Sequence, residues 1–148
     1  MRRKKGSFLI EAIISLSIVV LLLSILPGVI SKAELLSSKR YKLFKAKESL
    51  EAVSKELKYN NSYEEIKDKL QTEGIKIHYS EDFLEKMLEK NIFNIDETLE
   101  ENNFMKINII EEDSTFMKIK IEINIKINGD IKKIEHVMLK DKWMDYVY

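Results

Sequence analysis

The chain has 148 residues, and its 25 basic and 25 acidic residues cancel to a formal net charge of zero. This length accommodates one membrane segment and one modest globular domain. Because the sequence has no cysteine, it excludes a disulfide framework, a thiolate metal site, a cysteine nucleophile and a lipoprotein anchor.

The charge is distributed unevenly along the chain. Four cations stand at residues 2–5, and without them the remainder carries 21 basic against 25 acidic residues, a net charge of −4. A general nucleic-acid binder needs a concentrated basic surface, so the mildly acidic body argues against that class of protein.

An uncharged segment at residues 12–31 consists mostly of Ile, Leu, Val and Ala. Twenty residues at helical rise cover about 30 Å, the thickness of the hydrocarbon core of a bilayer. The run is longer than the apolar region of a secretory signal peptide, which has about 7–15 residues, and residues 29–33 make a poor cleavage site. We therefore expect a retained membrane helix.

Charge bias alone does not orient this helix. The four leading cations favour a cytoplasmic N-terminus. Six more cations, however, follow the segment between residues 32 and 47, and Glu34 is the only acid in that range.

A more specific signal is the sequence KKGSFLIE at residues 4–11, which runs directly into the apolar segment. A short basic leader ends in Gly6, and Glu11 stands five residues further on. This arrangement resembles the class III leader of type IV prepilins and pseudopilins. The resemblance covers about the first thirty residues.

In that family a membrane-embedded prepilin peptidase cuts after the glycine on the cytoplasmic side and methylates the new amino terminus. The resemblance implies cleavage between Gly6 and Ser7 and N-methylation of Ser7. Glycine suits this position because a side chain would obstruct an extended backbone in a narrow protease site. The family most often has Phe or Met after the cut and then a small polar residue, whereas here Ser7 precedes Phe8.

Glu11 is a carboxylate at the start of an apolar helix, where burial costs roughly 2.5–3.5 kcal/mol on insertion scales. In the family its partner is the free N-terminal amine of a neighbouring subunit, and their attraction in a low dielectric fixes the axial register between subunits. The resemblance implies this role for Glu11. The alternative is a glutamate that simply lies at the cytoplasmic interface.

Pro27 stands one residue before the position where many pilins kink this helix. Proline removes a helical hydrogen bond and clashes with the preceding turn, so Pro27 and Gly28 predict a helix kink. An ordinary transmembrane proline is the alternative interpretation.

We expect the helix to continue through residues 32–60. Apolar residues form a stripe on this otherwise charged helix, at Leu36, Leu43, Ala46, Leu50, Val53 and Leu57. One interpretation is a coiled coil, with only about three heptads and an interruption at Lys39. The other is a helix that lays its stripe on a sheet.

A sheet is predicted in the C-terminal third. Residues 117–127 alternate strictly between apolar and polar, which is typical of a half-buried strand. Asn128 and Gly129 predict a tight hairpin turn, and residues 131–139 a return strand with a bulge at Lys132-Lys133. A third strand is expected at 105–109 and a turn at 111–114. The leucine stripe would cover the isoleucine face of this antiparallel meander.

The middle of the chain, residues 63–103, predicts short helices at 63–71 and 82–90 and a short strand at 75–79. The aromatic C-terminus, residues 143–148, is either a final strand or a contact surface.

Other candidate chemistry has simpler explanations. His78 and His136 are 58 residues apart without metalloprotease-like spacing, so ordinary histidines are favoured over a metal or acid–base pair. The sequence has no glycine-rich phosphate loop and no nucleophile elbow, and its acidic clusters lack calcium-loop spacing. We expect no metal, no cofactor and no enzymatic activity.

Residues 39–47 mix cations with Tyr41 and Phe44. A DNA-uptake filament would use such a stretch on phosphates, and a membrane-proximal helix would use it on anionic headgroups. We favour the solvated face of an amphipathic helix, since Leu43 and Ala46 belong to the stripe.

Together with the resemblance, these elements predict an α+β, type IV pilin-like fold, with a long N-terminal helix packed on a small antiparallel sheet. Its regions are a leader (1–6), a membrane and polymerisation helix (7–31), an amphipathic continuation (32–60) and a head domain (61–148).

The family implies a minor pilin or pseudopilin of a type IV pilus, competence or type II secretion-like filament. Its N-terminus would be cytoplasmic and its head extracytoplasmic before assembly at the cell surface. The implied partners are a prepilin peptidase, other pilin-like subunits, an assembly platform and membrane lipid. The alternative is a single-pass, membrane-anchored binding or sensor domain that never polymerises.

Overall fold

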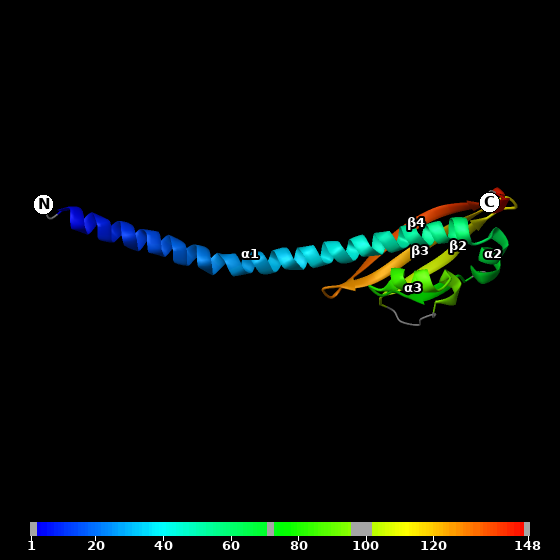
Figure 1. Ribbon diagram of the computed structural model, residues 1–148, viewed down its shortest axis with the longest axis horizontal. Coiled ribbons are helices and arrows are strands. Elements are labelled where there is room, and N and C mark those ends of the chain that lie inside the picture. Colours follow the sequence, from blue (N-terminus) through cyan, green and yellow to red (C-terminus); the bar gives the residue numbers. More distant parts are fainter. Residues whose placement is uncertain (1–2, 71–72, 96–101, 147–148) are drawn as a thin grey trace. The chain divides into compact units, whose positions relative to one another are not determined.

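The computed structural model describes residues 3–70, 73–95 and 102–146, which form two compact units, Met1–Arg40 and Tyr41–Tyr148. We call the second unit the head. The elements in chain order (Figure 1) are α1 Arg3–Lys55, a π-helical turn η1 Glu56–Asn60, α2 Tyr63–Leu70, β1 Ile75–His78, α3 Phe83–Glu89, a 3-10 turn η2 Ile92–Asn94, β2 Phe104–Glu112, β3 Phe116–Ile127, β4 Asp130–Asp141 and a 3-10 turn η3 Lys142–Tyr146.

The four strands form one antiparallel sheet in the order β1-β2-β3-β4. The predicted three-stranded meander is therefore present, and the short strand predicted at 75–79 joins it as an edge. Ile75 of β1 lies opposite Ile107 of β2. The two short helices predicted in the middle of the chain are α2 and α3.

The turn between β3 and β4 is the tight hairpin that the sequence predicts. Asn128 and Gly129 both have positive φ, 53° and 90°, which is the backbone geometry that matches the twist of paired strands.

The bulge predicted at Lys132-Lys133 is wrong. The register between β3 and β4 runs without a break, and it places Lys132 opposite Ile125. Lys133 points to the outer face of the sheet, where its ammonium group lies 3.0 Å from the carboxylate of Glu122. Two adjacent lysines fit a regular strand here because β4 is an edge strand with polar residues on both faces.

The irregularity of the sheet lies in β2 instead. Ile109 pairs with Ile119 and Glu111 with Lys118, so Ile110 is the extra residue of a bulge.

The hydrophobic core of the head lies between α1 and one face of the sheet. Every second residue of β3 from Met117 to Ile127 is buried. The stripe residues Ala46, Leu50, Val53 and Leu57 are buried as well, and the Ser54 hydroxyl lies 3.4 Å from the Met138 sulfur of β4. Figure 1 shows this half of α1 lying along the strands. The sheet-covering interpretation is therefore confirmed, and with it the predicted fold class.

The final strand proposed for the C-terminus is wrong for residues 143–146, which form η3. The chain leaves the sheet after Asp141, where the Lys142 N–H donates to the Thr115 carbonyl (2.9 Å). Residues 147–148 lie outside the described part of the chain.

Gly74 links α2 to the edge of the sheet. It has a φ of 73°, and its N–H donates to the Leu70 carbonyl (2.8 Å), an arrangement common at helix ends. A Cβ at this position would clash with the Ile107 carbonyl oxygen. The absence of a side chain therefore lets β1 approach β2.

We expect Gly74→Ala to lower the free energy of unfolding by about 2–3 kcal/mol, from positive-φ strain together with this clash. Gly129→Ala is the matched control, because Gly129 also has a positive φ (90°) but a Cβ there would have no atom within 4 Å. It should cost about 1–2 kcal/mol. Urea unfolding of the full chain in detergent measures both, and equal losses would show that the close approach is unimportant.

Candidate functional site

The N-terminal stretch of α1 is the strongest candidate site. Within the described residues, one helix is long and apolar enough to cross a membrane by length and composition, and its most apolar window of 18 residues has a mean hydropathy of 2.8 with no residue buried. The large apolar side chains from Phe8 to Ile30 are all about half exposed or more. Such a continuous apolar surface requires lipid or other apolar helices around it.

The predicted cleavage and register residues lie close together at the start of this stretch. Gly6 and Ser7 are in the first turns of α1, and Glu11 follows about one turn later in the same helix. Glu11 is exposed and is the only charged residue from 8 to 31. No other described residue hydrogen-bonds to it or forms an ion pair with it.

Two serines of the same stretch donate hydrogen bonds from their hydroxyls to backbone carbonyls of their own helix. Ser17 donates to the Ile13 carbonyl and Ser24 to the Val20 carbonyl, each at 2.8 Å. This back-bonding suits a helix surrounded by apolar groups, since it leaves no hydroxyl proton without an acceptor. Glu11, in contrast, has no hydrogen bond or ion pair with any described residue.

Pro27 lies inside α1, and the helix continues on both sides of it. Its ring nitrogen has no proton to donate to the Leu23 carbonyl one turn earlier. A Cβ on Gly28 would meet no atom within 4 Å. The kink at this position remains a prediction.

The histidines do not form a common site. His78 is in β1 and His136 is in β4, the two edge strands, so about 14 Å of sheet separates them. Across the described ranges, no group of three or more His, Asp or Glu residues could hold a metal ion.

Of the three cations that the basic stretch 39–47 contributes to the head, Lys42 and Lys45 have carboxylate partners among the described residues and Lys47 has none. Lys42 lies 3.3 Å from Glu81, and Lys45 lies 3.1 Å from Glu48. Lys42, Lys45 and Lys126 line a hollow of about 230 Å³ beside β1, but only Lys126 has no ion pair among the described residues. This arrangement gives little support to a phosphate-binding track, and so to a DNA partner.

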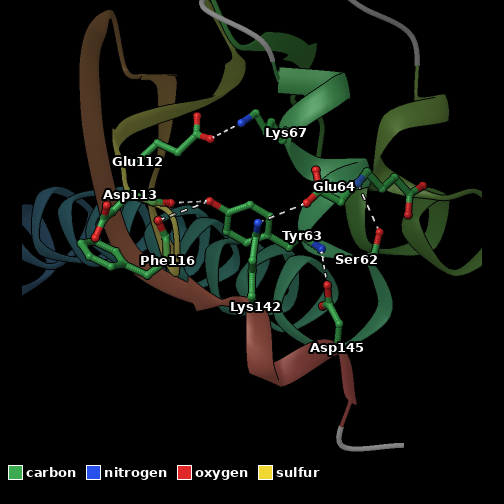
Figure 2. Close-up of polar contacts among 10 residues, drawn as sticks. Ser62, Tyr63, Glu64, Lys67, Glu112, Asp113, Phe116, Lys142 and Asp145 are labelled. Carbon is green, nitrogen blue, oxygen red and sulfur yellow. Dashed lines mark hydrogen bonds and ion pairs between the residues drawn. The ribbon is translucent and has the colours of Figure 1, made fainter.

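A cluster around Tyr63 is the main polar feature of the head that sequence reasoning missed (Figure 2). Tyr63 is 2% exposed. Its hydroxyl donates to the Asp113 carbonyl in the β2–β3 turn (2.9 Å), and its N–H donates to the Asp145 carboxylate (2.7 Å). The Lys142 ammonium lies 4.8 Å from the centre of the Tyr63 ring and 3.4 Å from the Glu64 carboxylate.

Lys140 completes this cluster from β4. It is 1% exposed, and its ammonium lies 2.7 Å from the Asp145 carboxylate and donates to the Lys58 carbonyl (2.9 Å). A buried cation with both a carboxylate and a carbonyl partner is well satisfied. The pair joins the end of the long helix to the C-terminus, which is a structural role.

The carboxyl of Asp145 has a lowered pKa. Burial alone would raise it, but the hydrogen bonds from the Lys140 ammonium and the Tyr63 N–H together outweigh that effect. A depressed folded-state pKa contributes stability above the unfolded pKa of about 3.9, and this contribution is lost as the pH falls through the folded value.

We therefore expect Asp145→Asn to lower the free energy of unfolding at neutral pH by about 3 kcal/mol, because it leaves Lys140 buried without its counterion. The loss should shrink below about pH 4. Urea unfolding of the full chain in detergent, followed by fluorescence of Trp143, the only tryptophan, measures it at several pH values. Asp130→Asn, at an exposed acid 4.0 Å from Lys132, is the control and should have little effect. Equal losses in the two variants would contradict the role of the pair.

Comparison of the chain with protein-family models, with curated proteins and with solved structures finds no match. Its own residues and geometry are therefore the basis for a functional proposal.

Proposed function

We propose that this chain is a minor pilin or pseudopilin, a filament subunit of a type IV pilus, competence or type II secretion-like machine, and not an enzyme. The observation that carries the proposal is the KKGSFLIE sequence at residues 4–11. It forms the first turns of α1 and leads into the stretch of that helix whose large apolar side chains are exposed.

The proposed mechanism is physical. The apolar stretch of α1 holds the subunit in the bilayer, with the N-terminus in the cytoplasm and the head outside. A prepilin peptidase removes residues 1–6, and an assembly ATPase on another protein drives the subunit out of the membrane. The apolar stretch then exchanges lipid for the helices of other subunits, which keeps the same surface away from water.

Glu11 and Ser7 have complementary roles in this proposal. Cleavage after Gly6 converts the backbone nitrogen of Ser7 into a charged amine. Glu11 of a neighbouring subunit accepts this cation, and the pair sets the axial register because any other displacement leaves a charge among apolar side chains. The lack of a partner for Glu11 among the described residues of its own chain supports this role.

Processing is the first prediction of this proposal. The full chain, extracted from membranes after expression with a prepilin peptidase, should lack residues 1–6 and carry one methyl group on Ser7. Without the peptidase the leader should remain. Intact mass spectrometry distinguishes these products.

Gly6→Leu should block the cleavage, whereas Gly28→Leu should leave it unchanged and serves as the control. If the wild-type leader remains in the presence of the peptidase, the filament proposal fails. The chain would then be better described as a single-pass, membrane-anchored binding or sensor domain.

Assembly should depend on the charge of Glu11. We expect Glu11→Gln to be cleaved normally but to reduce the amount of sheared, sedimentable filament at least tenfold, since losing one member of a buried pair costs about 3 kcal/mol or more. Glu34→Gln, at an exposed acid beyond the apolar run, is the control and should assemble normally. Normal assembly of the Glu11 variant would remove its register role.

A further inference from the structure

The head has an exposed aromatic pair on the outer side of α1. Tyr41 and Phe44 are 55% and 63% exposed and lie about one helical turn apart. At 100° per residue, Phe44 lies about 160° around the helix from the buried Ala46. Phe44 therefore points away from the core of its own head, whereas Tyr41 also borders the hollow beside β1. We call the pair of Tyr41 and Phe44 the aromatic knob.

An apolar groove lies between α1 and α3. It has a volume of about 370 Å³, and its apolar walls come from Ala52, Tyr59, Leu84, Met87 and Leu88. Leu88 is 90% exposed and Tyr59 is 52% exposed. Exposed apolar groups around a hollow of this kind mark a place where another protein surface packs.

The knob and the groove lie on the same side of the helix. Tyr41 in the knob and Ala52 in the groove wall are 11 residues apart within α1, about three helical turns, so they share one side and are displaced along the axis by about 16 Å. Both features belong to the head, and this displacement prevents them from meeting within one chain. They can meet between two copies that are displaced along the helix axis.

The charges around the two features are complementary. Lys47 is exposed one turn after Phe44, and Glu85 and Glu89 are exposed beside Leu88. None of these three residues has an ion pair in the part of the chain that the structure describes. The groove wall itself carries Lys55 and Glu56, whose charges cancel. Contact between the knob and the groove would bring Lys47 near Glu85 and Glu89.

We propose that the aromatic knob of one copy inserts into the apolar groove of the next copy in the filament. The contact joins two different patches, so it is heterologous and repeats without closing, as an open filament requires. This inference rests on the proposed function, and it assigns to the head a specific contact that adds to those of the apolar helices.

Cysteine cross-linking tests the contact directly, because the chain has no cysteine of its own. Both target side chains, those of Phe44 and Leu88, are exposed, so substitution should not disturb the core. The full-length double variant Phe44→Cys/Leu88→Cys, expressed with a prepilin peptidase and an assembly platform and then oxidised, should give a ladder of dimers, trimers and larger species on a non-reducing gel.

Each single variant should give no ladder, and a mixture of the two should stop at dimers. The double variant Ser114→Cys/Asp130→Cys is the control, because it places two exposed cysteines at opposite ends of β3, away from the knob and the groove. A ladder of equal strength in this control, or dimers from the Phe44→Cys variant alone, would overturn the inference.

Charge variants provide a second measurement. In the Phe44→Cys/Leu88→Cys background, Lys47→Glu should reduce the ladder at least threefold, and Glu85→Lys with Glu89→Lys should restore it. A ladder that does not respond to either change would contradict the proposed alignment of the two surfaces.

Intact mass spectrometry of the same samples shows whether residues 1–6 have been removed, and this result separates the two proposals. Leader removal and sedimentable filaments without a ladder would overturn the knob-and-groove contact and leave the filament function intact. A retained leader would overturn the filament function, and the contact that rests on it as well.

Discussion

The head depends on the burial of the isoleucine face of the sheet beneath the leucine stripe of α1. The apolar face of the four-stranded sheet needs a layer of apolar side chains to cover it. Leu50, Val53 and Leu57 supply that layer from one helix. Each such side chain contributes about 1.5–3 kcal/mol when it is fully buried, so the helix that carries the exposed apolar stretch also stabilises the head.

This dual use makes α1 change character along its length. From Phe8 to Ile30 its apolar residues surround the helix and are exposed, whereas from Ala46 onward they occupy one face and are buried. The first pattern suits an environment that is apolar on every side, and the second suits a boundary between a core and water. The two compact units of the chain follow this change.

Much of the fold could be predicted because its signals are local. Strict alternation identified β3, a two-residue turn identified the hairpin, and heptad spacing identified the buried stripe. The prediction of a bulge at Lys132-Lys133 failed because an edge strand has weak polarity differences between its faces. In β4 the exposed side includes Ile131, Val137 and Leu139, so alternation alone does not report which face is buried.

The contacts that the sequence did not reveal join residues that are far apart along the chain. Tyr63 and Asp145 are 82 residues apart, as are Lys140 and Lys58. Lys140 falls in the same phase of β4 as Met138, which indicates an inward position, but no spacing rule connects it to Asp145. The candidate N-terminal site is the opposite case. Its residues lie within six positions of one another, so the sequence shows them together, while the proposed partner of Glu11 belongs to a different copy.

The connection from Lys140 to Asp145 and Lys58 has a mechanical consequence. Under the proposed function the subunit would be pulled along its helix, and the head would then have to stay attached to that helix under load. Here the last strand is secured to the helix end by a buried ion pair and a hydrogen bond that would have to break together with the core beneath them. In a chain without disulfides, this ion pair and hydrogen bond take the place of a covalent cross-link between the last strand and the helix end. They can form again once the load is removed.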